Sequence, residues 1–446
     1  MHRVLPAINS HRMTSVLHVN ATVSSGGAAR AVLRIHRALN NYPGHLGIRS
    51  KFRAIKGESS DSSIVSGFPR RDPVRRRLQF YLDRWASRGF FTKNPTIHSI
   101  STPAPGLGQE INQRNRNGEA DIVHLHWLDS ETISIEEIGR LSMPVVWTMH
   151  DQWAFSGGEH WPGIPDTGSM NRNLPRYVEG YTKRNQPSWE SGQDINRLIW
   201  NRKRRSWIRP FHLVSPSNWL ADCARSSALM ANWPIHVVPN PIDLDVWYPA
   251  DKIHARSLLG LPLDGPLVLF GAVGGTADYR KGADLLIKAL DLIVSQIDTD
   301  YLRTLRLMIF GQSKPEHTND FAFPVHYSGK LYDDLSLRLL YSAADLFVVP
   351  SRQDNFPNTA VESHACGTPV VAFRTGGLPD IIDHHCTGAL ADPFDPASLS
   401  AEIKWVLEDP QRLRQLGVAA RCRAETLWNE GRVAQLYSEV YQDAME

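Results

Sequence analysis

Short apolar runs alternate with amphipathic segments along this 446-residue chain. The first apolar run covers residues 15–20, and a stretch of helical pattern follows at 28–40. Further runs of similar length lie at 121–126, 144–148, 211–215 and 235–238. Continuous apolar runs separated by amphipathic segments are typical of a parallel sheet covered by helices on both faces. The pattern therefore predicts an α/β domain in the first half of the chain.

A second series of the same kind begins after Pro239 and Pro241, where two prolines interrupt regular structure. Its expected strands are 267–271, 305–310, 325–327, 346–349, 370–373 and 388–391, and its expected helices include 283–297 and 397–407. The last forty residues are polar and helical in pattern. The whole pattern predicts two doubly wound Rossmann-like domains that face each other across a deep cleft.

The expected boundaries follow from these breaks in the pattern. We expect a flexible extension at 1–13, an N-terminal domain at 14–242, a C-terminal domain at 243–428 and a last helix at 429–446 that packs back toward the N-terminal domain. Residues 154–210 are rich in Gly, Pro, Asn and Trp, and they break the alternation. We interpret them as a large insertion at the carboxyl edge of the first sheet.

Composition narrows the class of protein. With 42% hydrophobic and 21% charged residues, the chain is typical of globular proteins, and it contains no apolar run long enough to predict a transmembrane helix. Its four cysteines are widely spaced, so they indicate neither a disulfide framework nor a zinc site, and a cytoplasmic protein is expected. The net charge of +3 does not indicate nucleic-acid binding. Basic residues nevertheless cluster at 70–84 and at 202–209.

The densest chemical signal lies at 350–372, where a buried strand ends, an irregular loop follows and a helix begins near Asn358. Loop amides and a helix N-terminus beyond the carboxyl end of a strand form an anion site. Asp354 lies in the loop and Glu362 about one turn into the helix, so two carboxylates are placed to accept hydrogen bonds from different hydroxyls of one ligand. The alternative is that Asp354 caps the helix and Glu362 faces solvent.

Three weaker signals lie at other expected strand ends. Arg280 and Lys281 are adjacent cations after a glycine-containing loop, which suits a diphosphate, although such pairs are often only surface features. Gly26 and Gly27 follow the first strand and allow close backbone approach to a phosphate. The third glycine of a dinucleotide fingerprint is missing, which disfavours NAD. His150 and the following Asp151 end another apolar run at the same sheet edge.

Together these motifs resemble the group 1 retaining glycosyltransferases of the GT-B fold. Asp354 and Glu362 match the acid-x7-Glu motif of that family, and the following Ala365-Cys-Gly-Thr-Pro-Val-Val-Ala372 extends the match. Further matching segments, in order, are Gly26-Gly27, 214–217, 238–240, Lys281-Gly282, 342–345 and Gly376-Gly377. The segments 121–127 and 150–158 are most similar to a subgroup active in exopolysaccharide assembly of the colanic-acid type.

The resemblance implies roles for individual residues. Glu362 would hold the ribose of a nucleotide-sugar donor, while Asp354 and the loop residues Asn355, Phe356 and Pro357 would meet the sugar and the diphosphate. Lys281 would neutralise the leaving diphosphate. The resemblance assigns no role to Arg280; we infer separately that it substitutes for the arginine that the family has at the position of Gly275. His150 would lie near the sugar, Gly27 with Gly26 near the phosphates, and Leu331 near the base. On the acceptor side we place Asp151 and His126.

The activity implied is transfer of a hexose-type sugar from a nucleotide-sugar to a glycan or polyprenyl-linked acceptor, with retention of configuration and without a cofactor or metal. The segment Asp243-Leu-Asp245 mimics a metal-binding DxD motif, but it falls in the interdomain linker. Two departures are notable: Gly275 stands where the family has an Arg, and Asp354 replaces the usual Glu. The subgroup often has a cysteine cluster after the 150–153 segment; here Glu159 stands where one cysteine is expected.

Three further interpretations stay open at this stage. The basic, Trp-containing stretch 197–211 is a candidate for peripheral contact with an anionic membrane, or it is an ordinary helix with buried tryptophans. A catalytically weak GT-B scaffold that only binds ligands is one alternative function. A nucleotide-sugar epimerase is another, although such enzymes lack the acid-x7-Glu loop.

Overall fold

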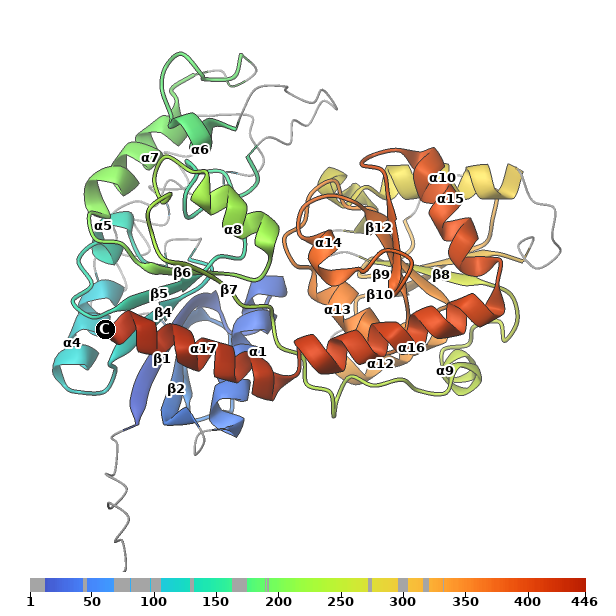
Figure 1. The fold of residues 1–446 in the computed structure, drawn as a ribbon, viewed down its shortest axis with the longest axis horizontal. Helices are drawn as coiled ribbons and strands as arrows, with labels where there is room; N and C mark the ends of the chain where they lie inside the picture. The colour runs from blue at the N-terminus through green and yellow to red at the C-terminus, as the bar shows by residue number, and fades with distance from the viewer. Residues whose placement is uncertain are drawn as a thin grey trace, which may run out of the picture.

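In the computed structural model the chain forms two α/β domains side by side, joined by a band of helices along one side (Figure 1). The structure describes residues 13–42, 46–67, 81, 97, 106–128, 132–162, 175–188, 190, 192–271, 275–295, 304–315, 321–331 and 333–446. Residues 1–12 of the expected extension at 1–13 lie outside these residues, and so do the arginines of the basic cluster at 70–84. The expectation of two doubly wound domains is confirmed.

The N-terminal domain is built on a seven-stranded parallel sheet in the order β3-β2-β1-β4-β5-β6-β7. Its strands are β1 (Thr14–Thr22), β2 (Ile48–Lys56), β3 (Ile64–Val65), β4 (Ile122–Leu125), β5 (Val145–Thr148), β6 (His212–Ser215) and β7 (Ile235–Val237). Its helices are α1 (Gly27–Asn41), α4 (Leu107–Arg116), α5 (Ile135–Ile138), α6 (Arg176–Glu179), α7 (Ile195–Ser206) and α8 (Asn218–Arg225). Because β1 and β4 are buried on both faces, they show continuous rather than alternating hydrophobicity.

The C-terminal domain contains a six-stranded parallel sheet in the order β10-β9-β8-β11-β12-β13. Its strands are β8 (Leu267–Gly271), β9 (Arg306–Phe310), β10 (Val325–Gly329), β11 (Leu346–Val349), β12 (Val370–Phe373) and β13 (Gly388–Ala391). Its helical elements are α9 (Lys252–Leu258), η1 (Gly275–Ala277), η2 (Tyr279–Lys281), α10 (Ala283–Ser295), α12 (Asp334–Ala343), α13 (Asn358–Ala365), α14 (Leu378–Ile381), α15 (Pro396–Leu407) and α16 (Pro410–Leu427).

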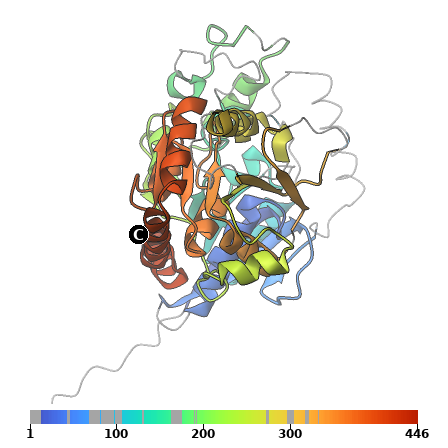
Figure 2. The ribbon, with the colours of Figure 1, turned by 90° about the vertical axis from the view of Figure 1, so that its right-hand side faces the viewer.

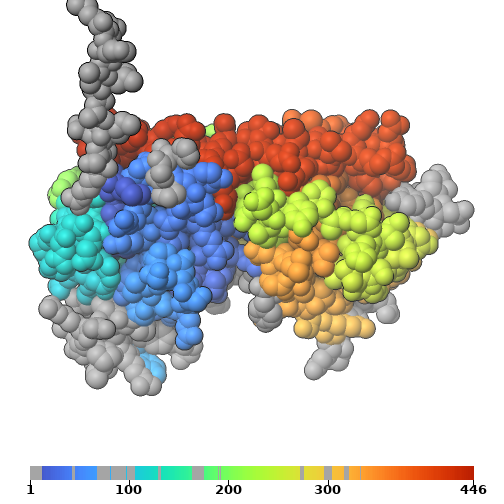
Figure 3. Space-filling model, turned by 90° about the horizontal axis from the view of Figure 1, so that it is seen from below, coloured from blue at the N-terminus to red at the C-terminus, as the bar shows by residue number. Residues whose placement is uncertain are grey.

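The C-terminal helix α17 (Glu430–Met445) returns to the N-terminal domain. Its apolar face lies in one core cluster with residues of β1, α1, β4 and β5, and its buried members are Val433, Ala434, Tyr437, Val440 and Tyr441. Beside this crossing, the N–H of Ile242 donates to the carbonyl of Trp428 at 2.8 Å, so the two chain segments that connect the domains run together. Figure 3 shows α16 and α17 as one continuous band along both domains, and Figure 2 views the C-terminal domain end on.

The strand orders determine where ligands are expected. Each sheet reverses its direction of winding once, between β1 and β4 in the N-terminal domain and between β8 and β11 in the C-terminal domain. Open α/β sheets bind their ligands beyond the carboxyl ends of strands at such a reversal. The loop with Gly26 follows β1 and the loop with Asp354 follows β11, so both predicted loops stand at these positions.

No helix of the described residues combines the length and apolar character that crossing a membrane requires.

The expected insertion at 154–210 contains regular helices in the part that the structure describes. Helices α6 and α7 lie there, and their aromatic residues belong to the main core of the N-terminal domain. Trp200 and Trp207 are buried, and the Nε1 of Trp207 donates to the carbonyl of Ile135 at 2.9 Å. The tryptophans of this basic stretch therefore pack inside the protein and are not available to a membrane.

Candidate active site

The carboxylate of Asp354 lies at the end of β11 beside two cations. It accepts a hydrogen bond from Lys281 Nζ at 2.5 Å, and Arg280 Nη1 lies 3.9 Å away. Burial acts to raise the pKa of Asp354, but the charges of Lys281 and Arg280 outweigh it, so the pKa lies below its ordinary value. Helix α13 has Pro357 as its N-cap, without a side-chain hydrogen bond. Asp354 therefore does not cap the helix; it forms an ionised cluster with Lys281 and Arg280.

Local backbone geometry brings Lys281 to this carboxylate. Asp278 caps the short helix η2 by accepting from the N–H of Arg280, and the helix ends at Gly282 with φ of 67°. A Cβ on Gly282 would lie 1.9 Å from the carbonyl oxygen of Pro350, so only glycine allows the backbone this close to the end of β11. The close approach of these two loops explains why Lys281 and Asp354, 73 residues apart, form an ion pair.

Glu362 does not face solvent: it is only 1% exposed. Its Oε1 accepts from Arg34 Nη2 at 2.6 Å and its Oε2 from the Tyr341 hydroxyl at 3.1 Å. Arg30 lies 3.8 Å from the same carboxylate. Both arginines come from α1 of the N-terminal domain, so the second carboxylate of the motif is held by a cross-domain ion pair. Arg30, Arg34 and Tyr341 were not predicted from the sequence.

The two predicted loops touch across the domain boundary. Asn358 Nδ2, at the start of α13, donates to the carbonyl of Gly27 at 2.9 Å. Asn355 Nδ2 donates to the carbonyl of His150 at 3.3 Å, and its Oδ1 accepts from the Ser217 hydroxyl at 2.6 Å. The N-terminus of α1, with Gly26 at φ of 89°, thus lies against the N-terminus of α13. Both helix ends lack a side-chain cap, so their free N–H groups are suited to an anion.

Phe356 and Leu331 are placed differently from Asn355. Phe356 is buried in the core of the C-terminal domain and meets the ring of Trp428 edge on, with 6.0 Å between ring centres. Leu331 is half-buried against the same core. The side chain of Phe356 therefore supports the loop, and only its backbone can meet a ligand.

His150 is half-buried at the boundary, and its ring lies in a row of histidines. Its Nε2 is 3.3 Å from Nδ1 of His126, whose own ring is only 2% exposed. Burial lowers the pKa of His150 to about 4, against a smaller opposite effect of Asp151, so the imidazole is neutral at physiological pH. Because the ring of His126 is enclosed, it does not reach an acceptor directly in this arrangement.

Asp151 is fully engaged by protein groups. Its Oδ2 accepts from His160 Nδ1 at 2.7 Å and from Trp127 Nε1 at 3.1 Å, and its Oδ1 accepts from the N–H of Trp153. The contacts favour a structural role for its carboxylate.

A small cavity between these residues and His150 has a volume of about 10 Å³, which is room for about one water. A larger cavity of about 830 Å³ at the edge of β2 contains none of the predicted site residues.

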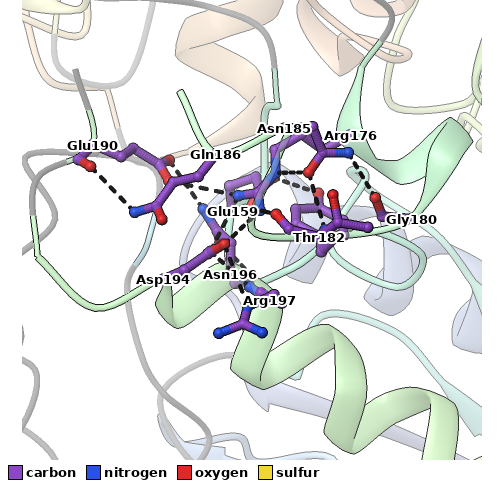
Figure 4. A network of polar contacts seen from close by, with 12 residues as sticks. Glu159, Arg176, Gly180, Thr182, Asn185, Gln186, Glu190, Asp194, Asn196 and Arg197 are labelled. Atoms are coloured by element: carbon purple, nitrogen blue, oxygen red, sulfur yellow. Dashed lines mark hydrogen bonds and ion pairs between the residues drawn. The ribbon is translucent and has the colours of Figure 1, made fainter. Parts of the chain in front are cut away.

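A network of buried charges supports the loop that follows His150. Arg176 Nη2 donates to Asp194 at 2.6 Å, and the side chain of Asn196 joins Glu190 Oε1 to the N–H of Gly158 (Figure 4). The carboxylate of Glu159, at the position of the expected cysteine, accepts a short hydrogen bond from the Tyr181 hydroxyl, and burial raises the pKa of Glu159 to about 7. Ionic and hydrogen-bonded contacts thus stabilise this loop.

Asp243 of the DxD-like segment accepts from the N–H groups of Asp245 and Val246 and so forms a turn.

Comparisons with known proteins agree with this geometry. Residues 25–246 match the model described as Glycosyltransferase Family 4, and residues 268–409 match the model described as Glycosyl transferases group 1. A D-inositol 3-phosphate glycosyltransferase of Acidothermus cellulolyticus is 33% identical over 342 residues, which cover 74% of this chain and 68% of that protein. One of Xylanimonas cellulosilytica is 28% identical over 345 residues, 73% of each chain.

Solved structures share the fold at lower identity. Anabaena Alr3699/HepE, solved in complex with UDP-glucose, is 16% identical, with a TM-score of 0.63 over 96% of this chain and 99% of its own. At this identity the likeness concerns the GT-B fold alone. The identity to the Acidothermus protein and the two family models that together span both domains establish the family. The chain belongs to the group 1 glycosyltransferases of the GT-B fold.

Proposed function

We propose that this glycosyltransferase moves a hexose-type sugar from a nucleotide-sugar donor to a hydroxyl of a glycan or polyprenyl-linked acceptor, with retention of anomeric configuration. The observation that carries the proposal is the cluster of Asp354, Lys281 and Arg280 directly opposite the His150 loop. It combines an ionised carboxylate, two cations and two uncapped helix N-termini at one point of the domain boundary. A diphosphate leaving group requires this combination of cations and N–H donors.

In this scheme the C-terminal domain binds the donor. The diphosphate lies between the N-terminus of α13 and the cations Lys281 and Arg280, which stabilise the charge that develops as the glycosidic bond breaks. Because protein cations supply this charge, we expect transfer to need no metal. The ribose hydroxyls contact Glu362, and for this the carboxylate must exchange part of its contact with Arg34.

The N-terminal domain completes the site. His150 approaches the sugar, while contacts such as the one between Asn355 and the His150 carbonyl hold the domains together. Closure of this kind excludes water and so favours transfer to an acceptor over hydrolysis.

For the acceptor, two observations favour different classes. The segments 121–127 and 150–158 support a role in surface or exopolysaccharide synthesis. The similarity to proteins named D-inositol 3-phosphate glycosyltransferase supports an inositol phosphate acceptor as the second candidate. The two candidates differ in the acceptor that the N-terminal domain would bind.

The test is a panel of UDP-, GDP- and ADP-sugars, each assayed by thermal shift and by slow release of sugar, with and without EDTA. We expect one nucleotide to stabilise the protein selectively and to be hydrolysed slowly in EDTA. Acceptor panels with inositol phosphates and with polyprenyl-diphosphate glycans then separate the two candidates, and NMR of the product reads its anomeric configuration. Loss of all activity in EDTA would overturn metal independence. No response to any donor would favour the scaffold function, or a donor site that forms only when the acceptor is bound.

Contact with a membrane is a separate part of the proposal. Ile208 is 80% exposed after α7, and the exposed Arg204, Arg205 and Arg209 surround it in sequence. An apolar residue among cations is suited to an anionic lipid surface. Flotation with vesicles that contain anionic lipid should carry the wild type but not an Arg204, Arg205 and Arg209 triple Ala variant. Equal flotation with neutral vesicles would exclude this contact.

A further inference from the structure

Three imidazoles form one hydrogen-bonded row from the core of the N-terminal domain to the domain boundary. His18 Nδ1 lies 2.9 Å from His126 Nε2, and His126 Nδ1 lies 3.3 Å from His150 Nε2. The ring centres are 5.2 and 5.5 Å apart, and the ring planes differ by only 22° and 28°. Nearly coplanar rings at these separations meet edge to edge, with the nitrogen lone pair of one ring facing the N–H of the next.

The direction of the row follows from its inner end. His18 is completely buried, and among the described residues its Nε2 has no hydrogen-bond partner. If His150 donated to His126 and His126 to His18, the remaining proton of His18 would sit on that nitrogen as a buried, unpaired N–H. Orphaned N–H donors are rarer in proteins than acceptors with an unused lone pair. The row therefore runs outward: His18 Nδ1–H donates to His126, and His126 Nδ1–H donates to His150.

Neutral rings are needed for this direction, and burial provides them. It lowers the pKa of His18 and His126 well below the ordinary range, and the neighbouring His124 acts in the same sense on both. His124 is fixed separately, between the hydroxyls of Tyr441 and Thr148 at 2.7 Å each. It packs against His126 but does not interrupt the row.

We infer that His18 and His126 are positioning residues that fix the tautomer of His150, so that its Nε2 accepts inside the protein and its Nδ1–H is a donor at the active site. No hydrogen bond of the His150 Nδ1 is found among the described residues, and His150 is half-buried rather than enclosed. With its proton on Nδ1, the neutral ring of His150 can donate a hydrogen bond to an oxygen of the sugar or the phosphate and so orient it. The ring then does not act as the base that removes a proton from the hydroxyl of the acceptor substrate. The inference rests on the proposed function for what His150 contacts, but the tautomer itself does not depend on it.

The test is an NMR experiment on the full chain with ring-¹⁵N-labelled histidine, without substrate, at neutral pH. The signals of His150 are assigned by their absence in a His150→Gln variant. We expect a protonated-type shift for Nδ1 and an unprotonated-type shift for Nε2. The reverse pattern in the wild type would overturn the inference. Because no substrate is used, an inactive protein with the expected tautomer would count against the proposed function alone.

Matched substitutions of His126 separate positioning from packing. His126→Asn places an N–H donor at the position of Nδ1, so His150 should keep its tautomer and kcat should stay within about threefold. His126→Leu removes the donor, so His150 should show mixed tautomers and kcat should fall about tenfold or more at unchanged donor KM. An unchanged His150 spectrum in His126→Leu would overturn the inference; if that variant does not fold, the wild-type spectrum decides.

A metal ion is the competing use of these rings, since His18, His124 and His126 bring ligand nitrogens within 4.8 Å of one another. Elemental analysis of the purified protein tests this use. We expect no stoichiometric metal. One zinc or copper ion per chain that is lost in His18→Gln would overturn the relay, because the lone pairs would then bind the metal.

Discussion

Arg34 Nη2 donates to Glu362 Oε1 at 2.6 Å and thereby joins two helices that belong to different domains. Both side chains are more than nine-tenths buried, so the pair exists only while the domains are closed. A carboxylate left buried without its cation costs several kcal/mol, about 3–5, and opening relieves this cost by hydrating it. The closed arrangement of the two domains therefore depends on this contact.

The first prediction concerns closure. Arg34→Ala should open the unliganded enzyme, seen as a larger radius of gyration in small-angle X-ray scattering, because Glu362 then gains more from water than from the closed interface. Arg37→Ala, an exposed position on the same helix, is the control and should scatter like the wild type. Identical scattering by Arg34→Ala and the wild type would show that other contacts hold the domains.

The second prediction concerns Glu362 itself. Glu362→Gln keeps the size of the side chain but removes the charge, so kcat/KM for the donor should fall at least about 100-fold, equivalent to roughly 2.7 kcal/mol. Tyr341→Phe removes only the neighbouring hydroxyl and should have a much smaller effect. Initial rates over a range of donor concentration measure both. Unchanged turnover in Glu362→Gln would refute a role for this carboxylate in donor binding.

The third prediction concerns the leaving group. Lys281→Met should lower kcat by about 100- to 1000-fold with little change in donor KM, because the cation acts mainly on charge that develops in the transition state. Arg280 is partly held by Asp278 and stacks over Trp161 at 4.6 Å, so Arg280→Met should cost less. Single-turnover rates separate this chemical effect from product release. A larger loss in Arg280→Met would assign the main charge to Arg280 instead.

Strands buried on both faces were predictable from the sequence, and the reason is physical. The bounds of β8, β11, β12 and β13 agree with their apolar runs, because nothing in these runs competes with burial. Strand β2 was missed, since Arg49, Lys51 and Arg53 interrupt its apolar positions. Arg53 is buried in spite of its charge, because it pairs with Glu110 of α4 at 2.9 Å. No local pattern reveals a partner 57 residues away.

The same limit applies to the site. Asp354, Lys281 and His150 could be identified because each follows an expected strand at the edge where ligands bind. Arg34 lies 328 residues from Glu362 on an ordinary amphipathic helix, so only the assembled fold shows their contact. The row of His18, His126 and His150 likewise needs the order β1-β4-β5, which places three distant strands side by side.

The fourth prediction separates the buried and exposed cations of α7. Lys203 is completely buried and donates to the carbonyls of Trp153, Ser156 and Gly157, with its Nζ 3.8 Å from the ring centre of Trp153. Lys203→Met should destabilise the protein by about 3 kcal/mol or more, because three buried acceptors lose their donor. Arg205→Met, exposed on the same helix, should change the free energy of unfolding by less than about 0.5 kcal/mol. Equal urea midpoints for the two variants would contradict the assignment.

The fifth prediction concerns acid stability. Burial lowers the pKa of His36 and His150 to about 4, and it lowers the pKa of His18, His124 and His126 well below the ordinary value. In the unfolded chain these rings titrate near 6.5, so between about pH 4 and 6.5 the unfolded state binds more protons. Stability therefore falls as the pH drops through this window, by up to about 1.4 kcal/mol per pH unit for each such histidine.

One buried carboxyl works in the opposite direction. The pKa of Glu159 is raised from 4.5 to about 7, so its contribution to stability is present at low pH and is lost as the pH rises through this range. This contribution of Glu159 to the free energy of unfolding offsets that of about one of the five histidines. The protein therefore still loses stability in acid. Urea midpoints at pH 7.5, 6.5 and 5.5 should fall steeply, and His36→Gln should reduce the slope by about one proton. A flat profile below pH 6.5 would mean that these rings are hydrated, and a hydrated row would no longer fix the proton of His150.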